Sequence, residues 1–227
     1  MKLVDAALII PALDEAESIG PLLSETPFHL LRQVIVVDNG STDGTGELAA
    51  KAGAQVVREE RQGYGYACAA GAAASEAKIL VFMDADGSFV PAELSRLLVL
   101  FEKSEVDLVL GSRLLAGIPR GTMPTHQLFG NRLIAWMLNR LYGLHLTDLG
   151  PFRALSHDLL DSLDMKELTY GWTVEMMVKV ARQGKRIVEV PVSYRSRFAG
   201  KSKIGGTIRG TILATYRIFS VVFRYAI

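Results

Sequence analysis

Residues 33–58 read QVIVVDNGSTDGTGELAAKAGAQVVR and contain a complete strand–helix–strand unit. Residues 33–37 and 54–58 are short runs rich in valine. Residues 45–52 between them have the composition of a helix, with Ser41 as a candidate N-terminal cap. Strands that alternate with helices of this length form parallel sheets, which helices cover on both faces. This stretch therefore predicts an α/β fold.

The same alternation continues on both sides of this unit. We expect further strands at residues 7–11, 79–83 and 106–110, and helices at residues 14–24, 64–76 and 91–103. In the second half we expect helices at residues 128–142, 157–163 and 172–183, and strands at residues 152–155 and 186–194. The last strand is expected at a sheet edge because Pro191 interrupts it. Since the chain shows no repeat and no linker, we expect a single domain around a mostly parallel central sheet.

The charge balance and the single cysteine narrow the function classes. The chain has 227 residues, of which 25 are Lys or Arg and 24 are Asp or Glu, so its formal net charge is +1. This balance excludes a generally basic surface for nucleic acid. Because Cys68 is the only cysteine, a disulfide framework and a cysteine-based zinc site are excluded, and a reducing compartment is expected.

We expect neither an export signal nor a membrane span in this chain. The first 11 residues contain too short an apolar run for a signal core. Residues 207–227 are apolar but carry Arg209, Arg217 and Arg224. This pattern suits either an amphipathic helix on a membrane surface or a packed helix with three solvated arginines. We expect a cytoplasmic protein that can lie peripherally on the inner face of the membrane.

Polar residues follow the expected strands at the edge where open α/β sheets bind ligands. The sharpest pattern is Asp84-Ala85-Asp86, directly after the apolar run 79–83. In an extended segment, residues i and i+2 point to the same side, so these two carboxylates would converge and repel each other unless a cation lies between them. Carboxylate oxygens suit Mg²⁺ or Mn²⁺, which commonly bridge to substrate phosphates. We expect a divalent metal site at Asp84 and Asp86, and the alternative is a solvated acidic turn.

Two further patterns suit a nucleotide. The loop at residues 195–203, RSRFAGKSK, carries Arg197 and Lys203, and a basic loop of this kind can fold over a diphosphate. Residues 38–44, DNGSTDG, combine a strand end with turn residues, and Asp38 or Asn39 can accept a hydrogen bond from a base or ribose. The alternatives are a solvated basic turn and ordinary turn chemistry.

Together these motifs resemble the inverting family-2 glycosyltransferases of the GT-A fold, in particular the branch of dolichyl- and polyprenyl-phosphate sugar synthases. The likeness extends from Leu8 to about Lys203 and rests on these segments: IPALDEAESI (10–19), VIVVDNGSTDGT (34–45), VFMDADGS (81–88), LGSR (110–113), TDLGPFRAL (147–155), GWTVEM (171–176) and EVPVSYRSRFAGKSKIGG (189–206). It implies one GT-A domain, with a nucleotide-binding half at residues 1–113, an acceptor half at residues 114–205 and a C-terminal amphipathic helix at residues 206–227.

The resemblance also implies roles for individual residues. Residues at the ends of the first two strands would form the nucleoside pocket of a UDP- or GDP-linked sugar: Pro11, Leu13, Glu15, Val37, Asp38 and Asn39. Asp84 and Ala85 would contact the nucleotide, and Asp86 would hold Mg²⁺ or Mn²⁺. Three cations would face the phosphates of the donor or the acceptor: Arg113, Arg197 and Lys203.

Several positions depart from the family's pattern. Leu13 stands where an aromatic residue often stacks on the base, Asn39 where a second acid is frequent, and Ser88 where a residue often assists the metal. Residues 123–131 carry fewer arginines than the acceptor-phosphate segment of the polyprenyl enzymes. The acceptor therefore stays open between a polyprenyl phosphate at the membrane surface and a soluble hydroxyl. A non-catalytic nucleotide-sugar-binding protein and a nucleotidyltransferase are further alternatives.

The acceptor decides whether the reaction needs a base. A phosphate is ionised at neutral pH, and Arg113 and Arg120 would hold it. A hydroxyl needs a general base, for which Glu175 is the first candidate and Asp148 the second. Trp172 is a candidate for stacking on a sugar, with a core position as the alternative.

Overall fold

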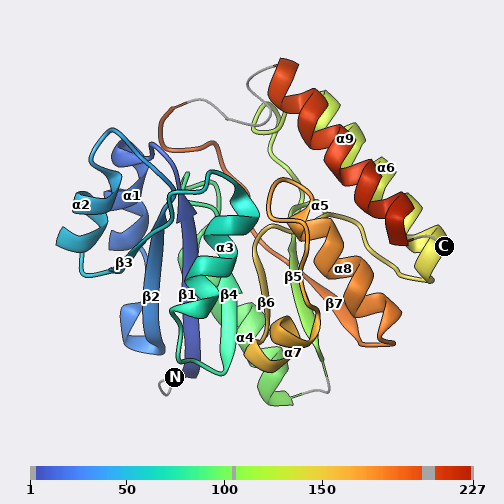
Figure 1. Ribbon diagram of the computed structural model, residues 1–227, viewed down its shortest axis with the longest axis horizontal. Coiled ribbons are helices and arrows are strands. Elements are labelled where there is room, and N and C mark those ends of the chain that lie inside the picture. Colours follow the sequence, from blue (N-terminus) through green and yellow to red (C-terminus); the bar gives the residue numbers. More distant parts are fainter. Residues whose placement is uncertain (1–3, 104–105, 201–207, 226–227) are drawn as a thin grey trace.

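The computed structural model describes residues 4–103, 106–200 and 208–225, and within them seven strands form one sheet (Figure 1). The strand order is β3-β2-β1-β4-β6-β5-β7. The strands are β1 (Val4–Ala12), β2 (Leu31–Asp38), β3 (Gln55–Arg58), β4 (Ile79–Phe82), β5 (Leu108–Ser112), β6 (Arg153–Ser156) and β7 (Ile187–Pro191). Of these, β6 runs antiparallel to its neighbours β4 and β5, and the remaining neighbours pair in parallel. The prediction of a mostly parallel α/β sheet is confirmed.

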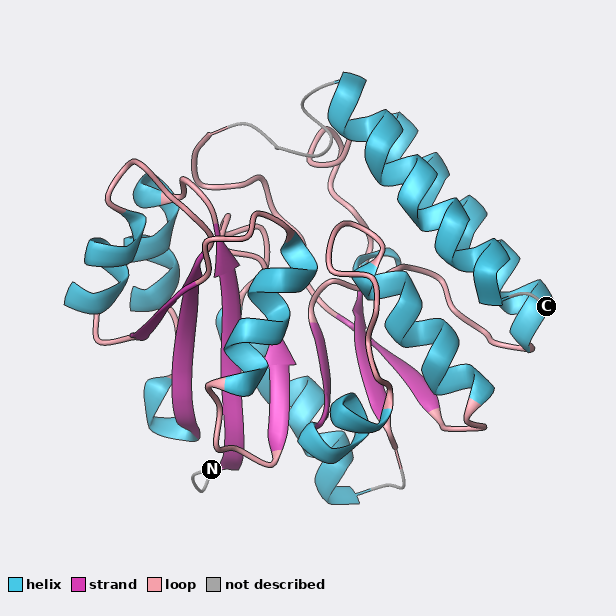
Figure 2. Ribbon diagram, in the orientation of Figure 1, coloured by secondary structure: helices cyan, strands magenta, loops and turns pink. Residues whose placement is uncertain are grey.

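Helices cover both faces of the sheet (Figure 2). They are α1 (Ala16–Ser24), α2 (Thr45–Lys51), α3 (Tyr64–Ala73), α4 (Leu94–Lys103), α5 (Arg113–Ala116), α6 (Thr125–Tyr142), α7 (His157–Ser162), α8 (Trp172–Arg182) and α9 (Ile208–Tyr225), with short 3-10 turns η1 (Phe28–Leu30) and η2 (Pro91–Glu93). Successive residues of β1 enter opposite cores, because side chains alternate across a strand. Ala7 and Ile9 share a core with α3, α6, α7, α8 and α9, whereas Leu8 and Ile10 share one with α1, α2 and α4.

The last strand is shorter than the sequence predicted. β7 ends at Pro191 and lies at the edge of the sheet as its proline predicted, and the amide of Val192 still donates to the carbonyl of Ser112 at 3.1 Å. Farther along, Tyr194 forms an isolated antiparallel bridge with Phe89. The chain after β7 therefore turns back onto the segment that follows β4.

The C-terminal helix α9 packs against α8, where Val221 and Val222 are buried. This contact matches the packed-helix alternative for its inner side. None of the helices in the described residues combines the length and the hydropathy needed to cross a bilayer.

The close approach of α3 to the sheet generates a paired stability prediction. A Cβ atom at Gly71 would overlap Ile9 and lie 2.9 Å from the Val37 side chain, whereas a Cβ at Gly130 in α6 would meet nothing within 4 Å. Gly71→Ala is therefore expected to lower the free energy of unfolding by about 1–3 kcal/mol through overpacking. Gly130→Ala is expected to raise it by about 0.5–1 kcal/mol, because glycine loses more backbone entropy in a helix. Urea unfolding of both variants measures the difference, and two changes of the same sign would contradict the described packing.

Candidate active site

Three segments that are distant in sequence meet at the carboxyl edge of the sheet. Asp84 and Asp86 follow β4, and Arg113 opens α5 directly after β5. The chain at residues 194–198 lies on the segment after β4, because the amide of Arg195 donates to the carbonyl of Ser88 and the amide of Phe198 to the carbonyl of Asp86, both at 2.9 Å. The fold thus gathers the predicted acidic pair, Arg113 and the start of the basic loop.

The acidic pair lies in a turn, not in the extended segment that the sequence suggested. β4 ends at Phe82, and the amide of Ser88 donates to Oδ1 of Asp86 at 2.9 Å. The two charges still interact. Burial and the charge of Asp86 raise the pKa of the Asp84 carboxyl to about 6, although Arg113 opposes this. The pair therefore carries negative charge that its surroundings only partly compensate.

Arg197 from the basic loop contacts Asp86 directly. Its Nη2 lies 2.6 Å from Oδ2 of Asp86. Its Nη1 is buried and has no hydrogen-bond partner among the residues that the structure describes. A guanidinium that pairs with a carboxylate and keeps an unsatisfied donor is suited to bind an anion. Lys203, the other predicted phosphate contact, falls outside the described residues.

Arg113 forms a buried ion pair with Asp148. Its Nε and Nη2 each donate to one oxygen of Asp148 at 2.7 Å, and its backbone amide donates at 3.0 Å. Although burial alone would raise the pKa of Asp148, hydrogen bonds from Arg113 hold this pKa below its usual value. Arg113 is thus the buried ion-pair partner of Asp148. Asp148 therefore orients Arg113, whose guanidinium also lies 5.2 Å from the ring centre of Tyr194.

Sequence reasoning missed two groups beside the acidic pair. Arg153 is fully buried and donates to the carbonyls of Gly150 and Thr173 at 2.9 Å, and burial lowers its pKa to about 10. Its charge helps to lower the pKa of Asp84. The hydroxyl of Tyr64 is buried, and it lies close enough to Asp84 to help lower the pKa of that carboxyl. The signal for Arg153 was its place at the start of the otherwise apolar strand β6, because a charged side chain is rarely buried without partners.

The loops after β1 and β2 are joined by hydrogen bonds. The amide of Asp14 donates to Oγ of Ser41 at 3.0 Å, and the amide of Glu15 donates to Oγ1 of Thr45 at 2.8 Å. Pro11 pairs in register with Val37 in the neighbouring strand. The fold therefore brings the backbone of the predicted nucleoside-binding residues Pro11, Leu13 and Glu15 beside the loop that follows Asp38.

Two of the predicted nucleoside contacts have other tasks in the structure. The Val37 side chain is fully buried under α3, and a contact between Val37 and a base stays a prediction. The side-chain Nδ2 of Asn39 donates to the carbonyls of Glu59 and Arg61, both at 2.8 Å. Its Oδ1 accepts from the backbone amide of Gly63 at 2.8 Å. Asn39 therefore ties β2 to the loop before α3, because both of its donors are used there.

Glu175 and Trp172 on α8 also have structural surroundings. The carboxylate of Glu175 is fully buried and accepts from the amides of Lys166 and Glu167 and from the Tyr225 hydroxyl, and it pairs with Lys179 at 3.0 Å. A carboxylate with its lone pairs so occupied helps to hold the fold, and the role of Glu175 as a general base stays a prediction. Trp172 packs edge-on against Phe82 in the core, which favours the core alternative.

The acidic pair has the chemistry of a magnesium or manganese site completed by a ligand. Among the described residues, no group of three or more His, Cys, Asp or Glu side chains converges as a metal site. Mg²⁺ is commonly held by one or two carboxylates, with waters and substrate phosphates as its other ligands. Burial, and after it the charge of Asp86, raises the pKa of Asp84. The carboxylates of Asp84 and Asp86 are hard oxygen donors that fit such an ion.

Comparison with known proteins points in one direction. Residues 7–163 match the family described as "Glycosyl transferase family 2". The chain is 35% identical to an undecaprenyl-phosphate mannosyltransferase of Micrococcus luteus, over 96% of this chain and 94% of the relative. It is 33% identical to a dolichyl-phosphate hexose transferase of Haloferax volcanii, over 90% of this chain and 92% of the relative.

A solved structure shares the fold. Glucosyl-3-phosphoglycerate synthase of Mycobacterium tuberculosis, crystallised with Mn²⁺, UDP-glucose and phosphoglyceric acid, superposes with a TM-score of 0.78 at 23% identity. The match covers 97% of this chain and 79% of that one. The expected GT-A fold is confirmed.

The uncompensated charge of the acidic pair generates a stability prediction. The folded protein binds a proton at Asp84 more tightly than the unfolded chain does, so this group lowers stability as the pH rises from about 4 to above 6. Asp84→Asn is expected to raise the free energy of unfolding at pH 7 by about 1–3 kcal/mol and to leave it nearly unchanged at pH 4. Denaturant unfolding at both pH values measures this. A variant that is less stable than the parent at pH 7 would show that Asp84 is a compensated structural carboxylate.

Proposed function

Because the chain belongs to glycosyl transferase family 2, we propose that it moves a hexose from a UDP- or GDP-linked donor to a polyprenyl phosphate, with inversion and with Mg²⁺ or Mn²⁺. Two relatives with high coverage carry names that state a polyprenyl- or dolichyl-phosphate transfer. The observation that carries the acceptor choice is the internal pairing of Glu175 and Asp148, the two carboxylates that the sequence offered as bases.

On the donor side, the acidic pair and the basic loop would act together. Asp84 and Asp86 would hold the divalent cation, whose charge offsets the charge that grows on the departing diphosphate. Arg197 would leave Asp86 and donate to phosphate oxygens instead, with the buried Nη1 gaining the partner that it lacks. Asp86 would exchange the Arg197 guanidinium for the divalent cation as its positive partner, and the diphosphate would gain Arg197 as a further cation.

On the acceptor side, the structure favours a nucleophile that needs no base. A hydroxyl must lose its proton to a free base during attack. Glu175 accepts from two backbone amides, Tyr225 and Lys179, and Asp148 is paired with Arg113. A phosphate monoester is already ionised at neutral pH, and Arg113 would hold it in an orientation that Asp148 fixes.

The transfer step forms one bond and breaks one bond. An oxygen of the acceptor phosphate forms a bond to the anomeric carbon, and the bond from that carbon to the diphosphate breaks on the opposite side. The electron pair of the broken bond leaves with the diphosphate. The configuration at the anomeric carbon is inverted, and no proton needs to move to or from Glu175.

A transfer assay tests this function. Purified protein is incubated with radiolabelled UDP- and GDP-linked hexoses, Mg²⁺ and detergent-dispersed polyprenyl phosphate, and the product is partitioned between organic solvent and water. We expect label in the organic phase from one donor. Label that appears only in a water-soluble product would overturn the polyprenyl acceptor.

The role of the acidic pair is tested in the same assay. Asp86→Asn removes the charge that would hold the cation, and transfer is expected to fall by about 100-fold or more. The matched control is Asp161→Asn, which removes an exposed carboxylate on α7 and is expected to leave the rate unchanged. Equal rates for both variants would remove Asp86 from the mechanism.

A further inference from the structure

The outward side of α6 carries large aromatic side chains where solvent-facing helices are usually polar. Thr125, Phe129, Arg132, Trp136 and Arg140 are exposed at helical spacing along one face, and His126 and Leu141 are exposed as well. Phe129 is 70% exposed and Trp136 is 62% exposed. The inner side carries the buried residues Ile134, Ala135 and Leu138. The helix therefore presents large aromatic rings, interleaved with arginines, to its surroundings.

Helix α9 has a similar outer side. Tyr216 and Phe223, seven residues apart, are 68% and 61% exposed, and the exposed Arg217 and Arg224 follow each of them. Both α6 and α9 contact α8, and they lie at the same end of the molecule, across the sheet from α2 (Figure 1). We call the exposed residues Phe129, Arg132, Trp136 and Arg140 of α6 the aromatic–arginine face.

Helices α6 and α9 carry basic side chains and no acidic ones. Each has 18 residues, and neither contains an aspartate or a glutamate. At the chain's average of 24 acidic residues in 227, two such helices would carry about four. Their sequences instead contain five arginines. A surface with aromatic rings, arginines and no acids of its own is complementary to an anionic lipid headgroup layer.

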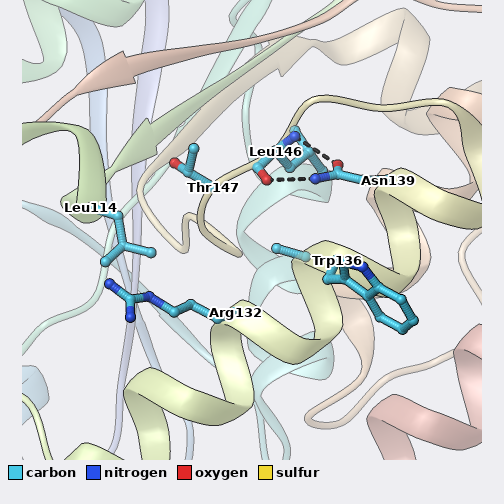
Figure 3. A pocket seen from close by; sticks show the side chains of 7 residues that line it. Leu114, Arg132, Trp136, Asn139, Leu146 and Thr147 are labelled. Atoms are coloured by element: carbon cyan, nitrogen blue, oxygen red, sulfur yellow. Dashed lines mark hydrogen bonds between the residues drawn. The ribbon is translucent and has the colours of Figure 1, made fainter.

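A cavity joins this face to the region of the candidate active site. Its volume is about 380 Å³, and it is lined by Leu114, Arg132, Ala135, Trp136, Asn139, Leu146 and Thr147. In Figure 3, Arg132 extends from α6 toward Leu114, whereas the Trp136 ring projects from the helix on the side away from Leu114. Leu114 and Thr147 are the chain neighbours of the ion-paired Arg113 and Asp148. Arg132 and Trp136 thus belong both to the cavity and to the exposed face.

We propose that the aromatic–arginine face docks on an anionic bilayer surface, with Trp136 and Phe129 in the interface and the arginines at lipid phosphates. The purpose of docking rests on the proposed function, since a lipid phosphate acceptor would then meet the protein beside Arg113. A second copy of the chain fits this face poorly. A symmetric pairing would bring the arginines of one copy against a face that also carries arginines and has no acids in α6 to offset them.

Vesicle binding tests the proposal without substrate. The full chain is mixed with vesicles of phosphatidylcholine, or of phosphatidylcholine and phosphatidylglycerol in equal amounts, with no polyprenyl phosphate and no donor. We expect sedimentation with the anionic vesicles, weakened by salt. Since Trp172 is only 1% exposed, the vesicle-induced blue shift of tryptophan emission is expected to come from Trp136 and to vanish in Trp136→Phe. A shift that survives in Trp136→Phe, or no sedimentation, would overturn the docking.

Charge reversal supplies the matched control. Arg140→Glu changes the charge by two units and is expected to lower partition onto anionic vesicles about 25-fold, at roughly fivefold per basic charge. Lys51→Glu makes the same charge change on the exposed surface of α2 and is expected to leave partition within about twofold. Equal losses would show that binding follows net charge alone.

Two further outcomes separate the alternatives. A dimer in sedimentation velocity that Arg140→Glu alters, with no vesicle binding, would assign the face to a second copy and overturn the proposal. Loss of vesicle binding with intact transfer to detergent-dispersed polyprenyl phosphate would remove only the docking. Intact vesicle binding without any transfer would remove only the proposed function.

Discussion

Mutual repulsion between Asp84 and Asp86 is the constraint around which the site is arranged. Both carboxylates lie in one partly buried segment after β4, and burial together with the charge of Asp86 raises the pKa of Asp84 even with Arg113 and Arg153 close enough to lower it. Arg197 reaches Asp86 from a segment more than one hundred residues away. The protein thus surrounds the pair with cations without neutralising it fully. Such residual charge is a cost to folding that a ligand can repay, which is typical of functional sites.

The sheet positions the residues of the site, and long-range ion pairs orient their side chains. Parallel strands bring the ends of β4 and β5 to one edge, and the bridge between Phe89 and Tyr194 brings the basic loop over it. Asp148 then fixes Arg113, and Glu175 fixes the chain at Lys166 and Glu167. Because these two carboxylates serve the framework, they support the proposed phosphate acceptor, which needs no proton transfer to a base, over a hydroxyl.

The architecture was predictable from sequence because each strand is a short apolar run bounded by turn residues, as in residues 33–58. The acidic pair was also recognisable, since its spacing and its place after an apolar strand are local features. The partners were not. Arg113 and Asp148 are 35 residues apart, and Glu175 and Tyr225 are 50 apart, so neither pairing leaves a local pattern. The tasks of Val37 and Asn39 depended on α3 and on the loop before it, which tertiary packing alone determines.

The central claim is that the acidic pair binds a divalent cation jointly with a nucleoside diphosphate. Titration calorimetry tests it most directly, with Mn²⁺ titrated into the protein alone and into the protein saturated with UDP or GDP. The account predicts that one of the two nucleotides tightens Mn²⁺ binding at least about tenfold, because the diphosphate supplies ligands that the two carboxylates lack. Equal Mn²⁺ affinity with and without either nucleotide would contradict it.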